Sequence, residues 1–221
     1  MCRFLLVKSA EAIRPSEILL PFAEMASTSK ALDGAWQGDG WGVCWQTKQG
    51  IWRLRKSIRP VWKETDEFER IPPCRIILAH ARSSSFPEHR EVVSFNQPYI
   101  DNGVAFVFNG FLKGVRLSSS VEGQIGAQKT WTLLSGLLKQ HLPGKAILKL
   151  ISLMLEKSRE IQAMNIGICD GQKMYAYCHP NDNPDYYDLH SFHKKGLDIL
   201  CSEPFKDFEF FPVQQGTVLS F

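Results

Sequence analysis

Short apolar runs recur along almost the whole chain and alternate with Gly, Pro, Asn or Asp. Runs of this kind, bounded by turn-forming residues, are typical of β-strands. The first run, residues 4–7, is continuously apolar, as expected of a buried strand. We therefore predict strands at residues 3–7, 41–46, 51–56, 75–81, 104–108, 165–169, 173–178, 197–201 and 216–220.

Helical periodicity is clearest at residues 128–142 and 145–164, with a weaker candidate at 15–25. Pro143 and Gly144, a helix-breaking pair, separate the two stronger candidates. Many strands and few helices favour an α+β fold of stacked sheets covered by helices. No Pro- or Ser-rich linker divides the chain, and the hairpin signal Asp170-Gly171 ties its C-terminal half together. We predict a single domain over residues 1–221.

Composition narrows the class of protein. No apolar run is long enough to cross a bilayer, and the N-terminus lacks the pattern of a secretory signal. The six cysteines show no CxxC spacing, and several lie in apolar runs. Buried free thiols in a reducing cytoplasm are the expected state, rather than disulfides or a zinc site. We predict a cytoplasmic protein without metal or cofactor.

The net charge is only +3, but basic residues and three tryptophans gather in residues 45–63. Such a mixture suits a nucleic-acid surface if cations and aromatic rings share one face. In a strand at residues 51–56, however, Arg53 and Arg55 share one face, whereas Trp52 and Leu54 share the other. An outer strand of a sheet is therefore the preferred interpretation of this stretch.

A cysteine at position 2 has its own chemical significance. After removal of Met1, Cys2 would carry a thiol and a free α-amine on one residue. An α-amine titrates near about 8 and a thiol near about 8.5, so one residue can supply both nucleophile and base. The alternative is that Cys2 is a small hydrophobic core residue.

Further short motifs follow in order along the chain. They are Met1-Cys2-Arg3, residues 39–42 (DGWG), His80 with Arg82, residues 97–99 (QPY), Asn109-Gly110, Asp170-Gly171 and residues 202–204 (SEP). In this order they resemble the class II glutamine amidotransferases, which are N-terminal-nucleophile hydrolases, and specifically the small stand-alone members that begin MCR. The resemblance covers nearly the whole chain. It implies a four-layer αββα sandwich of two antiparallel sheets flanked by helices.

Hydrolysis of a side-chain amide needs a nucleophile and donors for the developing oxyanion. An asparagine amide and a glycine N–H can supply such donors, and the resemblance assigns this role to Asn109 and Gly110. The alternative for this pair is a plain turn after a strand. The nucleophile in this interpretation is Cys2.

The resemblance assigns Arg82 to the substrate's carboxylate, a task that suits a planar guanidinium; the alternative is a surface ion pair. Gly40 would let the backbone pass close to the substrate, or form a tight hairpin. Trp41 would wall the pocket, or fill the core. We expect His80 to be a scaffold residue.

One position departs from the family pattern. Members usually carry an aspartate for the substrate's ammonium group where the first long helix opens, and Lys129 stands there. A lysine repels an ammonium group, so free glutamine is expected to be a poor substrate. Three interpretations stay open: an amide whose amine is absent or blocked, Glu122 as a substitute for the aspartate, or a catalytically inactive binding module. The HNG histidine of the family is Phe108 here. The released ammonia would leave, or pass to a separate synthase subunit.

Overall fold

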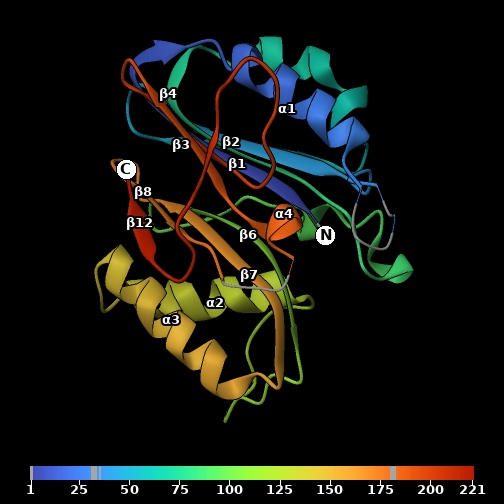
Figure 1. Cartoon of the computed structure of the whole chain (residues 1–221), viewed down its shortest axis with the longest axis vertical. Helices are drawn as coiled ribbons and strands as arrows, with labels where there is room; N and C mark the ends of the chain where they lie inside the picture. The colour runs from blue at the N-terminus through green and yellow to red at the C-terminus, as the bar shows by residue number, and fades with distance from the viewer. Residues whose placement is uncertain (1, 31–33, 35, 180–182) are drawn as a thin grey trace.

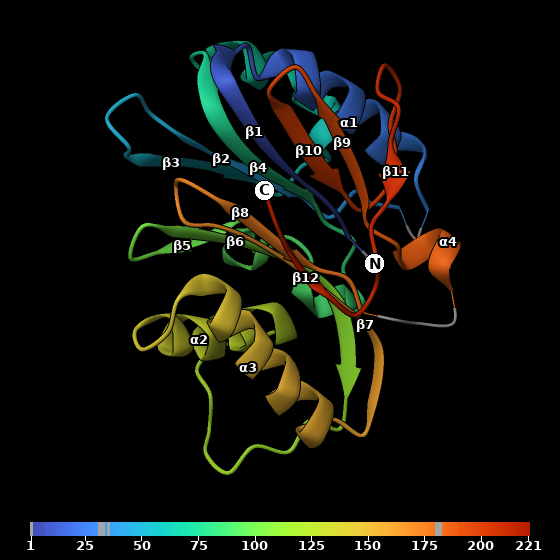
Figure 2. The same ribbon diagram turned by 60° about the vertical axis from the view of Figure 1, so that its left-hand side comes forward.

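Two antiparallel sheets, one of seven strands and one of five, pack face to face with helices on both outer sides (Figures 1 and 2). This computed structural model describes residues 2–30, 34, 36–179 and 183–221. The arrangement confirms the predicted α+β class and the four-layer αββα sandwich.

The seven-stranded sheet has the strand β1 near its centre, paired antiparallel with β4 on one side and β10 on the other. Helix α1 (Ser16–Thr28) and the short 3₁₀ helices η1 (Val61–Lys63) and η2 (Thr65–Arg70) contribute buried residues to the core on its outer face. In spatial order its strands are β11 (Phe211–Pro212), β9 (His190–Lys194), β10 (Leu197–Cys201), β1 (Arg3–Ile13), β4 (Cys74–Ala81), β2 (Trp41–Gln46) and β3 (Trp52–Ser57).

The five-stranded sheet is built around the long pair β6 and β7, and helices α2 (Gly126–Leu138) and α3 (Pro143–Lys157) cover its outer face (Figure 2). Three short helices lie outside the two sheets: η3 (Pro87–His89), η4 (Val93–Phe95) and α4 (Pro184–Tyr187). In spatial order its strands are β12 (Val218–Ser220), β8 (Met174–Tyr177), β7 (Glu160–Cys169), β6 (Val104–Lys113) and β5 (Tyr99–Asp101).

Alternation along the central strands explains the layering. In β1, Leu5 and Val7 join the core beneath α1, whereas Phe4 and Leu6 join the core between the sheets. Because successive side chains of a strand point to opposite faces, a continuous apolar run buries both of its faces. Gly167 of β7 lies against Leu6, since a Cβ there would approach the Leu6 Cδ1 atom to 2.6 Å. The sheets therefore make close contact where β1 crosses β7.

Several predicted boundaries are wrong, among them the end of β1, which is Ile13 and not residue 7. Two others concern the pair of β6 and β7. Strand β6 does not end before Asn109-Gly110 but continues to Lys113, so this pair lies within a strand and not in a turn. The helix predicted to reach Met164 ends at Lys157, and β7 begins at Glu160. Both differences have one cause: the first half of β7 pairs with the second half of β6, and this tertiary pairing overrides local propensity.

The basic stretch, residues 45–63, runs from the end of β2 through the edge strand β3 to η1. The Trp52 side chain packs against the core between the sheets, and its Nε1 donates to the Gly103 carbonyl oxygen at 2.8 Å. Arg55 pairs with Glu67 of η2 at 2.8 Å. Aromatic rings and charges therefore serve packing and ion pairing here, in line with the interpretation as an outer strand.

The cysteines and the helices also bear on the expected class of protein. All six cysteines lie in the described part of the chain and are free, and only Cys2 among them is not fully buried. Among the described residues, no helix combines the length and apolar character needed to cross a membrane.

Candidate active site

A cavity of about 780 Å³ lies where Cys2, the end of β4, the middle of β6 and the start of α2 meet. Five of the seven predicted site residues line it, and they come from distant parts of the sequence: Cys2, Arg82, Asn109, Gly110 and Lys129. Gly40 and Trp41 are not among the lining residues. The structure thus brings together the predicted nucleophile, the predicted oxyanion donors and two cations.

Cys2 precedes the first residue of β1, and its side chain is half-buried. The Ser83 N–H donates to its Sγ at 3.4 Å, and the Ser83 carbonyl oxygen lies 3.5 Å from the same atom. Ser83 follows β4, which pairs with β1 through Arg3 and Ala81. The end of β4 therefore holds the sulfur at one point of the cavity wall.

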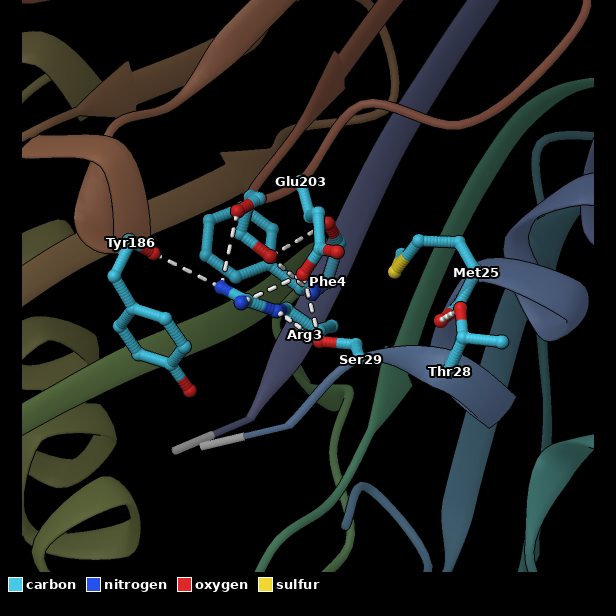
Figure 3. A network of polar contacts seen from close by, with 8 residues as sticks. Arg3, Phe4, Met25, Thr28, Ser29, Tyr186 and Glu203 are labelled. Carbon is cyan, nitrogen blue, oxygen red and sulfur yellow. Dashed lines mark hydrogen bonds and ion pairs between the residues drawn. The ribbon is translucent and has the colours of Figure 1, made fainter. Parts of the chain in front are cut away.

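A network around Arg3 fixes the strand end that carries Cys2 (Figure 3). The buried Arg3 guanidinium pairs with Glu203 Oε2 at 2.6 Å and donates to Ser29 Oγ at 2.9 Å. Ser29 Oγ in turn donates to Glu203 Oε2, and the Tyr186 carbonyl oxygen accepts from Arg3 Nη1 at 3.0 Å. One side chain thereby joins β1, the end of α1, the segment after β10, and α4.

Ser202 completes this attachment through the backbone. The Phe4 N–H donates to Ser202 Oγ at 2.9 Å, and the Ser202 N–H donates to the Phe4 carbonyl oxygen at 3.1 Å. Arg3 Nη1 also donates to the Ser202 carbonyl oxygen at 3.2 Å. The MCR and SEP motifs are therefore two halves of one structural unit beside Cys2. Neither motif signals in the sequence that the two segments are in contact.

Arg82 is 5% exposed and follows directly after β4. Its Nη2 donates to the His89 carbonyl oxygen at 2.7 Å and to Ser84 Oγ at 3.2 Å. Its Nη1 has no hydrogen-bond partner among the residues that the structure describes. A buried guanidinium with unused N–H donors at a cavity wall favours an anion as the missing partner.

Asn109 is 2% exposed and lies in β6 opposite Asn165 of β7. Neither its Nδ2 nor its Oδ1 has a partner within the described part of the protein. Buried amides normally find partners, so an unpaired amide on a cavity wall favours a ligand as its partner. At Gly110, a Cβ would collide with the Phe108 ring and approach the Ala163 carbonyl oxygen to 2.7 Å, so glycine is required there.

The DGWG segment supports two residues of the cavity wall through hydrogen bonds. The Arg82 N–H donates to the Gly40 carbonyl oxygen at 2.8 Å, and Asp39 Oδ2 accepts from the Ser84 N–H at 2.7 Å. Gly40 has φ of +113°, and a Cβ there would collide with Asn96. Gly40 therefore permits a backbone turn that supports Arg82, at one remove from the cavity.

Trp41 fills the core beneath α1 and is 1% exposed. Its Nε1 donates to Glu64 Oε2 at 2.9 Å, and its ring meets the Phe68 ring edge to face with centroids 5.6 Å apart. Trp41 is therefore a core residue and does not form a wall of the pocket.

Gln97 joins the cavity to the neighbouring strand. Its Oε1 accepts from the Phe108 N–H at 2.6 Å, its Nε2 donates to the Phe108 carbonyl oxygen at 3.0 Å, and the same Nε2 lies 3.2 Å from His80 Nε2. His80 is fully buried, and burial, with the charges of Arg82 and Lys56, lowers its pKa to about 3. A neutral His80 with a fixed partner fits the expected scaffold role. The QPY motif contains Gln97, but the sequence alone assigns it no role.

Lys129 and Glu122 lie on different cavities. Lys129, in the first turn of α2, is exposed and lines the cavity that contains Cys2. Glu122 lines a neighbouring cavity of about 580 Å³ together with Lys56 and Trp131. Glu122 therefore does not occupy the place of an ammonium-binding carboxylate in the first cavity.

Comparisons with known proteins find similarity in structure only. No family profile matches the sequence, and no curated sequence is detectably similar. A glutamine aminotransferase class-II domain protein from Silicibacter pomeroyi superposes with a TM-score of 0.68 at 14% identity, covering 99% of this chain and 94% of the other. Glutamine phosphoribosylpyrophosphate amidotransferase from B. subtilis, complexed with ADP and GMP, gives 0.70 at 13% identity over 99% of this chain.

The chain spans about half of that B. subtilis protein, 47% of its length. A predicted glutamine amidotransferase from Pseudomonas aeruginosa matches with a TM-score of 0.53 at 13% identity, over 100% of this chain and 93% of the other. At these identities the similarity concerns the fold. The chain has the fold of class II glutamine amidotransferase domains, and that fold spans essentially all of its residues.

Proposed function

We propose that this protein is an amidohydrolase of the class II glutamine amidotransferase type, formed by a single domain over residues 1–221. The observation that carries the proposal is the convergence of Cys2, Arg82 and Asn109 on one cavity, where neither polar atom of the Asn109 amide has a partner among the described residues. The fold shared with solved glutamine amidotransferases supports it.

In the proposed reaction, the substrate's carboxylate pairs with Arg82 and its side-chain amide lies against Cys2. The thiolate attacks the amide carbon and forms a C–S bond, while the carbonyl oxygen becomes an oxyanion. The Asn109 Nδ2 and the Gly110 N–H stabilise that oxyanion. The C–N bond then breaks, and the leaving nitrogen takes a proton and departs as ammonia.

Water then attacks the thioester, the C–S bond breaks, and a carboxylate leaves while the thiol is restored. The proton transfers need a base near the sulfur. After removal of Met1, the α-amine of Cys2 would serve as that base. The ammonia either leaves or passes to a separate synthase subunit. We expect the reaction to take place in the cytoplasm.

The test combines mass, labelling and turnover. Intact mass should show the loss of Met1, because a retained methionine would acylate the proposed base. Iodoacetamide should label Cys2 first, since the other cysteines are buried. Cys2→Ala should keep its melting temperature and lose ammonia release.

Undiminished ammonia release by folded Cys2→Ala would rule out the nucleophile. The alternative is a binding module that has lost catalysis. It would be favoured if the correctly processed wild type binds carboxylate-bearing amides and never releases ammonia from them.

A further inference from the structure

The wall of the Cys2 cavity carries two cationic side chains and no carboxylate among its described lining residues. Arg82 and Lys129 both line it, whereas none of its lining residues, all within the described part of the chain, is aspartate or glutamate. Arg82 is buried and has an unused Nη1. An ammonium group placed here would meet two cations and no counter-ion, and would lose hydration without compensation.

The start of α2 adds partial positive charge to the same cavity. Gly126 and Ala127, the first residues of the helix, line the same cavity. The N-cap residue Ile125 supplies no side-chain cap, and the first turn contains no acidic residue. The first N–H groups of a helix are free donors and carry partial positive charge. These N–H groups and the Arg82 Nη1, which has no partner among the described residues, therefore give the cavity donors for anionic oxygen atoms.

Other parts of the cavity wall are apolar or bear hydroxyl groups. Phe111 and Leu112 of β6 line it, as do Val115, Leu117 and the serines at positions 118–120. Cavities of roughly 300 to 1,000 Å³ hold ligands of drug size, and this one has about 780 Å³. The cavity therefore suits a molecule longer than a single amino acid.

We propose that the substrate is an N-acylated, glutamine-type amide that carries a second carboxylate on its acyl group and no ammonium group. This inference rests on the proposed function and specifies its substrate class. Arg82 binds the carboxylate next to the amide-bearing chain. Lys129 and the start of α2 bind the second carboxylate, and the acyl chain joins the two carboxylates within the same cavity.

Three probes separate the contributions of the two charges: L-glutamine, N-acetyl-L-glutamine and N-succinyl-L-glutamine. N-acetylation removes the ammonium group, and succinylation adds the second carboxylate. Because a charge-assisted hydrogen bond is worth about 10- to 100-fold in affinity, kcat/KM should rise by about 10-fold or more from the first probe to the third. Lys129→Glu should lower kcat/KM for N-succinyl-L-glutamine by about 100-fold and improve the relative rate with L-glutamine.

Lys139→Glu is the matched control, since Lys139 is an exposed lysine at the other end of α2, outside the cavity lining. It makes the same charge change and should leave the ratios among the probes unaltered. A wild type that prefers L-glutamine, or a Lys129→Glu variant with unchanged ratios, would overturn the inference while ammonia release still supports the proposed function.

Calorimetric measurement of probe binding to Cys2→Ala tests the substrate class independently of catalysis. Binding of N-succinyl-L-glutamine at least 10-fold tighter than L-glutamine would support the charge selection even if the wild type proved inactive. Equal affinity for the three probes in that variant would overturn it.

Discussion

The two asparagines that face each other across β6 and β7 offer a sharp test of the oxyanion assignment. Asn109 and Asn165 are direct cross-strand partners, and both are buried. Both polar atoms of the Asn165 amide have partners: its Nδ2 donates to the Tyr187 carbonyl oxygen, and its Oδ1 accepts from the His179 N–H at 3.2 Å. The Asn109 amide has no protein partner within the described residues.

The two alanine substitutions should therefore differ in stability. Asn165→Ala removes two hydrogen bonds, and each of them is worth about 0.5 to 1.5 kcal/mol. Asn109→Ala removes two polar atoms that are already unpaired, so the lost packing is offset and the change should stay within about 1 kcal/mol. Urea unfolding followed by tryptophan fluorescence measures both free energies.

The effect on activity should be the reverse. Loss of one oxyanion donor costs about 2.7 to 4 kcal/mol in the transition state, or about 10²- to 10³-fold in kcat. Ammonia release by Asn109→Ala should fall by that factor at saturating N-succinyl-L-glutamine. The reasoning would be refuted if Asn109→Ala lost as much stability as Asn165→Ala while keeping its turnover, because Asn109 would then be a structural residue.

Three further changes test the surroundings of the site. Glu203→Gln removes the charge that faces Arg3 but keeps one acceptor, so urea unfolding should show a loss of about 1 to 3 kcal/mol; unchanged stability would contradict the role of the network. His80 has a folded pKa of about 3, below its unfolded value, so the unfolded chain binds the proton first. Stability should thus fall by about 1.4 kcal/mol per pH unit as the pH drops below about 6, and His80→Gln should lack this slope in pH-dependent urea titrations. Gly42→Ala would push a Cβ into the Gln97 carbonyl oxygen, so the melting temperature should fall; a loss of about 1 to 3 kcal/mol is typical of overpacking.

Most strands can be predicted from the sequence because turn-forming residues bound them and their apolar faces are buried. The predicted strands at residues 41–46 and 197–201 match β2 and β10 residue for residue. Strand β9 was missed, since its sequence HSFHK has little apolar content and gains its order by pairing with β10. Pairing partners far along the chain decide such elements, and local patterns do not contain them.

The candidate site can be predicted only in part from the sequence. Cys2 is conspicuous by its position, whereas Arg82 and Asn109 are assigned through the family resemblance of their motifs, and the fold brings all three to one cavity. Trp41 could not be placed, because an aromatic residue beside two glycines suits a pocket wall and a core equally well. The contact between Arg3 and Glu203 links residues 200 positions apart, and no local pattern signals it.

The central position of β1 has a consequence for the synthesis of this protein. One edge of β1 can pair with β4 once residue 81 has been made, but its other edge belongs to β10, which ends at Cys201. At about 5 to 20 residues per second, the roughly 120 residues in between take about 6 to 24 seconds to translate. During that interval a nascent chain presents an apolar, unpaired strand edge, which is the feature that chaperones guard against. The strand end that carries Cys2 therefore gains its contacts with Ser202 and Glu203 only late in synthesis.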